Sequence, residues 1–118
     1  MKFGYDPETA EWLAQLAGGS EDFDWDAGNR TKNRKHHVEQ ADIEALFRFS
    51  VVFVGRIIEP VHPEERWLVL GQDEENRRLA LVFTRRGQKL RPISCRPMRR
   101  NERRIYEDAL QENTETSA

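Results

Sequence analysis

The chain reads VVFVGRII at residues 51–58 and RWLVLG at residues 66–71, with a proline-containing loop between the two runs. Short runs rich in β-branched, aliphatic and aromatic residues, bounded by turn residues, are typical of β-strands. Two further runs of this kind follow at residues 78–84 and 89–95. Because hairpin-length connections join these four runs, they predict a four-stranded, mainly antiparallel sheet.

Two positions in these runs predict local irregularities. Gly55 interrupts the first run, which favours a β-bulge there. Pro92 has no backbone N–H to donate, so the fourth run belongs at a sheet edge or contains a bulge.

Helical patterns flank the strands. Pro7 after Asp6 suits the start of a short acidic helix, and Asp26 can cap the next helix. The expected helices span residues 7–17, a polar stretch at 28–37, an amphipathic stretch at 39–49 and a last stretch at 99–112, with Ile105, Ala109 and Leu110 turned inward. We therefore expect an α+β fold, with N-terminal helices before the sheet, a C-terminal helix after it, and all helices on one face.

The length of 118 residues allows one domain, since domains take roughly 100–200 residues. We expect this domain at residues 23–112. An acidic N-terminal extension at residues 1–22 precedes it, and a disordered tail at residues 113–118 follows it.

Charge is distributed unevenly along the chain. The net charge is −2, yet residues 85–104 hold nine basic side chains and one acidic one, a local charge of +8. Dense arginine suits phosphate recognition, because each guanidinium is a planar and permanently charged donor. The alternative is a solvated face, or arginines paired with the acidic ends of the chain. We also consider that residues 1–22 shield the basic face.

Several classes of function find no support in the sequence. A single cysteine, Cys95, excludes a disulfide framework and favours a buried, inert thiol in a reducing compartment. His36 and His37 are adjacent and would diverge on a helix, so no metal motif is present and no cofactor is expected. No apolar run reaches the roughly 18 residues of a membrane span, and the N-terminus lacks a signal-peptide core. We expect a soluble cytoplasmic protein.

A metal-free set of Arg, Lys, His and Glu side chains suits RNA cleavage by the 2′-hydroxyl of the substrate. That reaction needs a base, an acid and cations around the phosphorane. Lys35 or His36 can serve as acid or base, although a surface histidine is more often idle. Ser94 and Arg96 share a sheet face by period two. Arg96, Arg100 and Arg104 share a helix face if the last helix begins early, with pairing to Glu107 and Asp108 as the alternative.

A resemblance to a known family spans residues 23–110. Its motifs read FxWDxGNRxKNxKHxV at 23–38, IEALF at 43–47, HPEER at 62–66, VFT at 82–84, RPISxR at 91–96 and RxxYE at 103–107. In this order they resemble the BrnT toxins of bacterial type II toxin–antitoxin systems. The resemblance implies a RelE-like fold and a ribonuclease that stops translation.

The resemblance and the chemistry together predict a site. The expected catalytic residues are Lys35, His36, Glu65, Arg91 and Arg96. The expected substrate-binding residues are Lys32, Arg66, Arg86, Ser94 and Arg100. Which group is the base and which is the acid stays open.

Three positions depart from the family pattern. Cys95 replaces a usual alanine, and His37 replaces a usual glycine that would end the preceding turn. Arg99 replaces the Thr or Ser that caps the last helix against Glu102, so we expect that capping box to be lost.

The resemblance also implies partners. These are an RNA substrate and a BrnA-type antitoxin. The antitoxin would be a small, ribbon–helix–helix-like DNA-binding protein. The toxin would bind promoter DNA only through this antitoxin. Two alternatives remain. One is a degenerate, non-catalytic module that acts through a partner protein or nucleic acid, and the other is a plain nucleic-acid-binding domain.

Overall fold

The computed structural model describes residues 1–117, with side chains described up to residue 112. It contains one five-stranded antiparallel sheet, ordered β1-β2-β3-β4-β5. The strands are β1 (Lys2–Gly4), β2 (Val52–Glu59), β3 (Trp67–Gln72), β4 (Arg78–Arg86) and β5 (Lys89–Pro97). The helices are α1 (Pro7–Ala14), α2 (Ala27–Arg30), α3 (Gln40–Leu46) and α4 (Arg100–Ser117), with short 3-10 turns η1 (Ser20–Asp22) and η2 (Arg34–His36). The α+β class is confirmed.

The expectation of four strands is wrong by one. The four expected runs form β2 to β5, and β1 adds a fifth strand by pairing Phe3 with Ile57 of β2. A three-residue strand is too short to show a period of two, so its sequence carries no strand signal. The bulge at Gly55 is confirmed by the register shift between Phe53 and Gly55.

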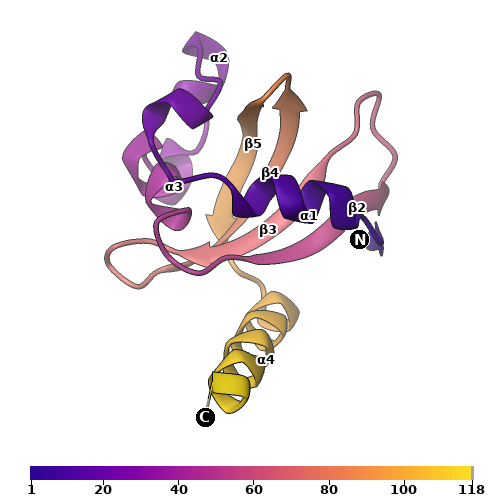
Figure 1. Cartoon of the computed structure of the whole chain (residues 1–118). Coiled ribbons are helices and arrows are strands. Elements are labelled where there is room, and N and C mark those ends of the chain that lie inside the picture. The colour runs from indigo at the N-terminus through magenta and orange to yellow at the C-terminus, as the bar shows by residue number, and fades with distance from the viewer. Residues whose placement is uncertain (118) are drawn as a thin grey trace.

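Helices lie on both faces of the sheet, not on one face as expected (Figure 1). Side chains alternate along β3 and β4, and both faces of these strands are apolar. One face packs against α1, α3 and the segment before α2; we call it the α1–α3 face, and it carries Trp67, Val69, Leu79, Leu81 and Phe83. The other packs against α4; we call it the α4 face, and it carries Leu68, Leu70 and Ala80 together with Tyr106 of α4.

The N-terminal lead is built into this fold. Asp6 caps α1 by accepting from Thr9 N, and its Oδ2 also accepts a 2.7 Å hydrogen bond from Trp67 Nε1 of β3. Trp12 and Leu13 of α1 are buried in the core of the α1–α3 face. Residues 2–14 therefore contribute a strand and a helix to the sheet and the core.

The prediction of one polar helix at residues 28–37 is wrong. Asp26 does cap a helix, through a capping box with Asn29, but this helix α2 is a single turn. The chain then turns, and η2 follows. A segment with no apolar face gains little from helical packing. Its buried side chains, Asn29 and Asn33, hydrogen-bond to the backbone of β5 instead. The amphipathic helix at 39–49 is present but shorter, since α3 ends at Leu46.

α4 begins at Arg100 and extends away from the sheet (Figure 1). Its inward residues differ in part from expectation, because Glu102 and Tyr106 are buried whereas Ile105 is 40% exposed. Since α4 begins at Arg100, Arg96 lies on β5 and does not join a helical stripe with Arg100 and Arg104. The helix runs past the expected end at residue 112. The tail expected at 113–118 falls outside the residues whose side chains are described, and Ala118 lies outside the described residues altogether.

Candidate nucleic-acid-binding and catalytic face

Three of the predicted site residues lie on the same side of β5. Ser94 is opposite Val82, and Arg96 is opposite Ala80, which places both on the α4 face. Strict alternation would put Arg91 on the other face. However, Ser94 pairs with Val82 and Pro92 with Phe83, so Ile93 is an extra residue in the strand. This bulge brings Arg91 opposite Thr84 and onto the α4 face.

A fourth predicted residue, Arg66, joins this face from the loop before β3. Its neighbours Glu65 and Trp67 both line a cleft on the α1–α3 side, so by alternation we place the Arg66 side chain on the opposite face. Thr84 lies on the neighbouring strand, where its hydroxyl donates a 2.8 Å hydrogen bond to the carbonyl of Glu65. The Nε of Arg66 is buried and has no hydrogen-bond partner in the structure. We call Arg66, Arg91, Ser94 and Arg96 the arginine face.

Arg91 is held by two carboxylates that sequence reasoning did not assign to it. Its Nη2 lies 2.9 Å from Asp26 Oδ2 and its Nη1 lies 3.4 Å from Asp24 Oδ2. The segment that carries them runs along the free edge of β5, where Asp24 N donates to Leu90 O and the Asn29 side chain donates to Pro92 O. Hydrogen bonds from the Asn29 backbone and from Arg91 lower the pKa of Asp26, so this carboxylate stays charged beside Arg91.

Arg96 forms a two-pronged pair with Glu102 in the first turn of α4, at 2.7 and 2.9 Å. The Glu102 side chain is 4% exposed. Burial alone would raise the pKa of Glu102, but the Arg96 guanidinium and the Arg99 backbone N–H hold it below its ordinary value. Glu102 also accepts a 2.8 Å hydrogen bond from Arg99 N. This is one of the two hydrogen bonds of a capping box, and it forms although Arg99 replaces the usual Ser or Thr.

Both arginines keep donors for a ligand. A guanidinium carries five N–H groups, and the pairs with Asp24, Asp26 and Glu102 occupy only some of them. The pairs restrict where each guanidinium lies, which favours directional binding of phosphate oxygens. The ion pairs of Arg91 and Arg96 involve Asp24, Asp26 and Glu102, not residues 1–22, which pack mainly on the α1–α3 side. Within the described residues, the N-terminal lead therefore forms no ion pair with Arg91 or Arg96, although Trp12 lies against Arg85 of the basic segment.

The turn that carries Lys35 and His36 is anchored at both ends. Before it, Asn33 Oδ1 accepts a 3.0 Å hydrogen bond from Cys95 N of β5. After it, His37 adopts a left-handed conformation with φ of 59°, and its carbonyl accepts a 2.8 Å hydrogen bond from Arg77 Nη1. Position 37, where the family pattern has glycine, therefore has a backbone conformation that glycine adopts more easily than histidine.

Arg77 links this turn to the rest of the fold. It lies 2.7 Å from the buried carboxylate of Asp73 and 3.1 Å from Asp42 of α3. Burial opposes the charge on Asp73, but hydrogen bonds from the Arg77 backbone and side chain lower its pKa. Together with the Asn33–Cys95 hydrogen bond, these contacts fix the turn against the edge of β5 at Cys95.

Other predicted residues lie apart from the arginine face. Glu65 lines a polar cleft on the α1–α3 side, together with Asp6, Arg56 and Arg85. Arg86 pairs with Glu64 at 3.2 Å. The structure therefore does not bring the side chain of Glu65 to the arginine face. Lys32 and Lys35 are exposed near β5, His36 is half-buried, and Arg100 is exposed on α4.

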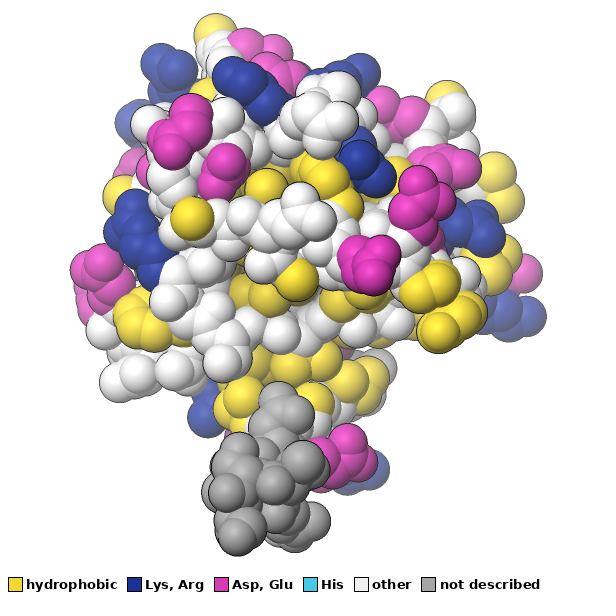
Figure 2. Space-filling model, viewed as in Figure 1, with side chains coloured by type: hydrophobic (Ala, Val, Ile, Leu, Met, Phe, Trp, Pro, Cys, Tyr) yellow, Lys and Arg dark blue, Asp and Glu magenta, His cyan; other side chains and the backbone are white. Residues whose placement is uncertain are grey.

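The surface of the α1–α3 side carries no block of one charge. Acidic and basic side chains are mixed there, and apolar side chains show where the sheet meets α4 (Figure 2). The described side chains include no group of three or more His, Cys, Asp and Glu residues arranged to hold a metal ion. Burial raises the pKa of Cys95 to about 12, so its thiol is not a nucleophile at neutral pH. None of the described helices is long and apolar enough to cross a membrane.

Sequence reasoning missed Asp24, Asp26, Glu102 and Thr84 as neighbours of the arginine face. A signal existed for the first two, because Phe23 and Trp25 alternate with them as in an edge strand. Comparison with known proteins places the chain in a family. Residues 25–102 match the model of the ribonuclease toxin BrnT of type II toxin–antitoxin systems. Searches of curated proteins and of solved structures found no match. Since the match covers more than half of the chain, the chain belongs to the BrnT family of ribonuclease toxins.

Proposed function

We propose that this toxin is an endoribonuclease that needs no metal ion and uses the 2′-hydroxyl of its RNA substrate as nucleophile. The observation that carries the proposal is the bulge at Ile93, which gathers Arg91, Ser94 and Arg96 on one sheet face. Two carboxylate-held guanidinium groups there suit a phosphate that gains negative charge during the reaction. We place the reaction in the cytoplasm, where RNA substrates are found.

The reaction breaks one bond and forms one. The 2′-oxygen attacks the adjacent phosphorus as a base removes its proton, and the bond from phosphorus to the 5′-oxygen breaks as an acid protonates that oxygen. The products are a 2′,3′-cyclic phosphate and a free 5′-hydroxyl. Lys35 and His36 lie on the anchored turn beside β5 and are our candidates for base and acid. Arg91 and Arg96 stabilise the phosphorane, and Lys32, Arg66, Arg86, Ser94 and Arg100 bind the flanking RNA.

The side chain of Glu65 does not lie with the other predicted catalytic residues. The family resemblance assigns it a catalytic role, yet its side chain lines the cleft on the α1–α3 side. Its backbone carbonyl, which accepts from Thr84, is what connects it to the arginine face. We propose that this position holds the loop of Arg66 in place, and Glu65→Gln should then retain cleavage.

A cleavage assay with matched variants tests the proposal. The purified chain is incubated with end-labelled RNA in the presence of EDTA. We expect Arg91→Lys and His36→Gln to reduce the rate by at least tenfold, because each removes directional donors or a titrating group from the reacting phosphate. Arg30→Gln is the control, since Arg30 is exposed and has no ion pair with any side chain of residues 1–112. Equal rates for all four proteins would overturn the proposed site.

The antitoxin partner is part of the proposal. We propose a BrnA-type antitoxin, ribbon–helix–helix-like, that binds this chain and links it to promoter DNA. Expression of the chain should arrest growth, and coexpression of the adjacent small reading frame should restore it. Arrest that no neighbouring frame relieves would contradict this assignment.

A second candidate function rests on two observations. Arg91 and Arg96 are both paired with carboxylates, and the Glu65 side chain lies on the other side of the sheet. A non-catalytic BrnT-like module that binds only a partner protein or nucleic acid would have this arrangement. It predicts RNA or antitoxin binding without any cleavage product, whether or not His36 is replaced.

A further inference from the structure

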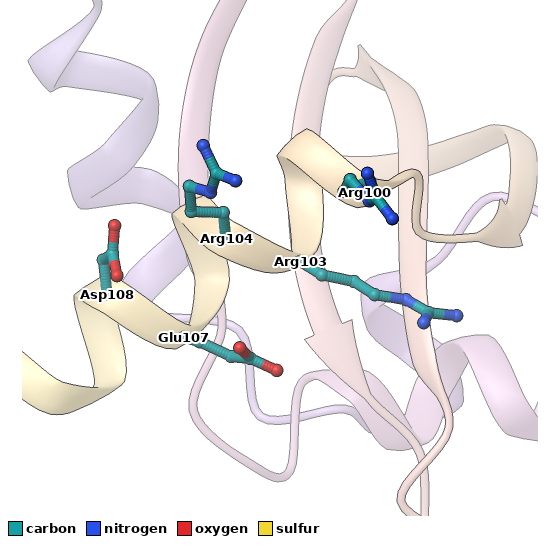
Figure 3. A pocket seen from close by; sticks show the side chains of 5 residues that line it. All are labelled: Arg100, Arg103, Arg104, Glu107 and Asp108. Carbon is teal, nitrogen blue, oxygen red and sulfur yellow. The ribbon is translucent and has the colours of Figure 1, made fainter.

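The first two turns of α4 carry a group of exposed arginines directly after the arginine face. The chain leaves β5 one residue after Arg96, and the Arg96–Glu102 pair fixes the start of α4 against this strand. Arg100, Arg103 and Arg104 are all exposed. Figure 3 shows their side chains leaving adjacent turns of α4, with Glu107 and Asp108 one turn further along. The five residues line one shallow hollow.

Neither of the two described acids beside them, Glu107 and Asp108, forms an ion pair with these arginines. Glu107 stands four residues after Arg103, the usual spacing for a helical pair. Its carboxylate instead lies 3.2 Å from Arg78 of β4. Within residues 1–112, where side chains are described, Arg100, Arg103 and Arg104 have no carboxylate within ion-pair distance.

Two of these residues lie beyond what the family match covers. The match ends at residue 102, so Arg103 and Arg104 are outside it, although Arg103 begins the RxxYE stretch at 103–107 that resembles the family. They are also absent from the site proposed above. The fold offers no packing reason for them, since the α4 residues that pack on the sheet are Glu102, Tyr106 and Leu110.

We infer that Arg103 and Arg104 form a second RNA-binding site, which takes backbone phosphates of the strand that extends beyond the cleaved bond. The inference rests on the proposed function, because it assumes that RNA lies on the arginine face. Guanidinium groups bind phosphates without reading the base, so this site adds affinity and salt dependence but no sequence preference. A short RNA that ends at the arginine face does not reach it.

Binding of 2′-O-methyl RNA tests the inference without cleavage, because this analogue lacks the nucleophile. Fluorescence anisotropy is measured from about 50 to 200 mM salt with a dodecanucleotide and a tetranucleotide. The test variant is Arg103→Gln/Arg104→Gln. The control is Arg30→Gln/Lys89→Gln, which removes the same charge from two exposed residues that form no ion pair among the described side chains.

We expect the test variant to lower the salt slope for the dodecanucleotide by about 1.4, since each single-strand phosphate contact contributes about 0.7. Extrapolated to a common 1 M reference, this corresponds to roughly 25-fold weaker binding at 0.1 M salt. The control should change affinity less than about threefold, and the tetranucleotide should bind both variants alike. Equal losses in test and control variants would overturn the inference, because net charge alone would then explain them.

Other outcomes separate this inference from the proposed function. If the wild-type chain cleaves RNA but the test variant keeps the wild-type slope, the second site is wrong and the proposed function stands. If α4-dependent binding is found but no RNA is cleaved, the second site stands and the proposed function fails. If the test variant loses antitoxin binding while RNA affinity is unchanged, the arginines serve the protein partner and the inference is overturned.

Discussion

Replacing Arg96 should destabilise the fold as well as affect function. Its guanidinium is the main partner of Glu102, whose side chain is 4% exposed. Arg96→Met leaves that carboxylate buried with a single hydrogen bond from Arg99 N. Breaking a buried pair from one side costs about 3–5 kcal/mol. Because the Arg96 side chain is still 17% exposed, we expect the lower end, about 3 kcal/mol.

The double variant Arg96→Met/Glu102→Leu separates the lost pair from the unpaired charge. Replacing both partners by apolar residues is often neutral or stabilising. We therefore expect it to recover most of the loss, to within about 1 kcal/mol of the wild-type protein. A single-domain protein has only about 5–15 kcal/mol of stability, so the single variant loses a large share of it.

Urea unfolding followed by tryptophan fluorescence measures both effects. The single variant should show a clearly lower midpoint with an unchanged slope. A loss below about 1 kcal/mol for Arg96→Met, or a double variant as unstable as the single one, would refute this reasoning. The double variant also matters for function, because it removes Arg96 from the arginine face without leaving a buried charge. If that stable protein no longer cleaves RNA, the loss is due to the missing guanidinium of Arg96 and not to unfolding.

Four further predictions follow from local geometry. His37→Gly should stabilise the fold by about 1 kcal/mol, because φ of 59° strains a side-chain-bearing residue; a lower urea midpoint would contradict it. Asn33→Ala should cost about 1–3 kcal/mol, since the buried Cys95 N–H loses its acceptor; an unchanged midpoint would speak against this. The pKa of Glu102 is lowered from an ordinary value near 4.5, so its contribution is present above that pH and is lost as pH falls through the folded value. Acid titration of Glu102→Gln should show a weaker loss of stability below pH 4.5, and parallel curves would contradict it. Cys95 has a pKa raised to about 12 and is buried; it should react with a thiol reagent at pH 8 only after unfolding, and rapid labelling of the folded protein would disprove this.

Four of the five strands were predictable because each of them carries its own signal. The runs that form β2 to β5 are apolar and end at proline or turn residues, and Gly55 marks its own bulge. β1 has only three residues and gains its structure by pairing with β2. The polar segment at 28–37 looked helical from its caps. Its buried asparagines, however, bond to β5 across more than 60 residues of sequence, which no local pattern reveals.

The site was predictable in composition but not in arrangement. The local excess of positive charge pointed to β5 and α4, and the family motif pointed to the same arginines. Pro92 predicted an edge strand or a bulge, and β5 is an edge strand with a bulge. The position of Arg91 depends on which residue is extra, and the sequence pattern does not single out Ile93. Its partner Asp24 lies 67 residues away in sequence, and the contact exists only because the segment before α2 runs along the edge of β5. Tertiary packing therefore decided which carboxylates accompany the arginines.

One measurement tests the central claim most directly. A DNA strand that contains a single ribonucleotide is incubated with the purified chain in EDTA, and its products are analysed by mass spectrometry. We predict one cut, directly after the ribonucleotide, that leaves a 2′,3′-cyclic phosphate and a 5′-hydroxyl. The Arg91→Lys variant should make that product more slowly. Cleavage at deoxynucleotides, or cleavage that appears only when a divalent metal ion is added, would contradict the proposed mechanism.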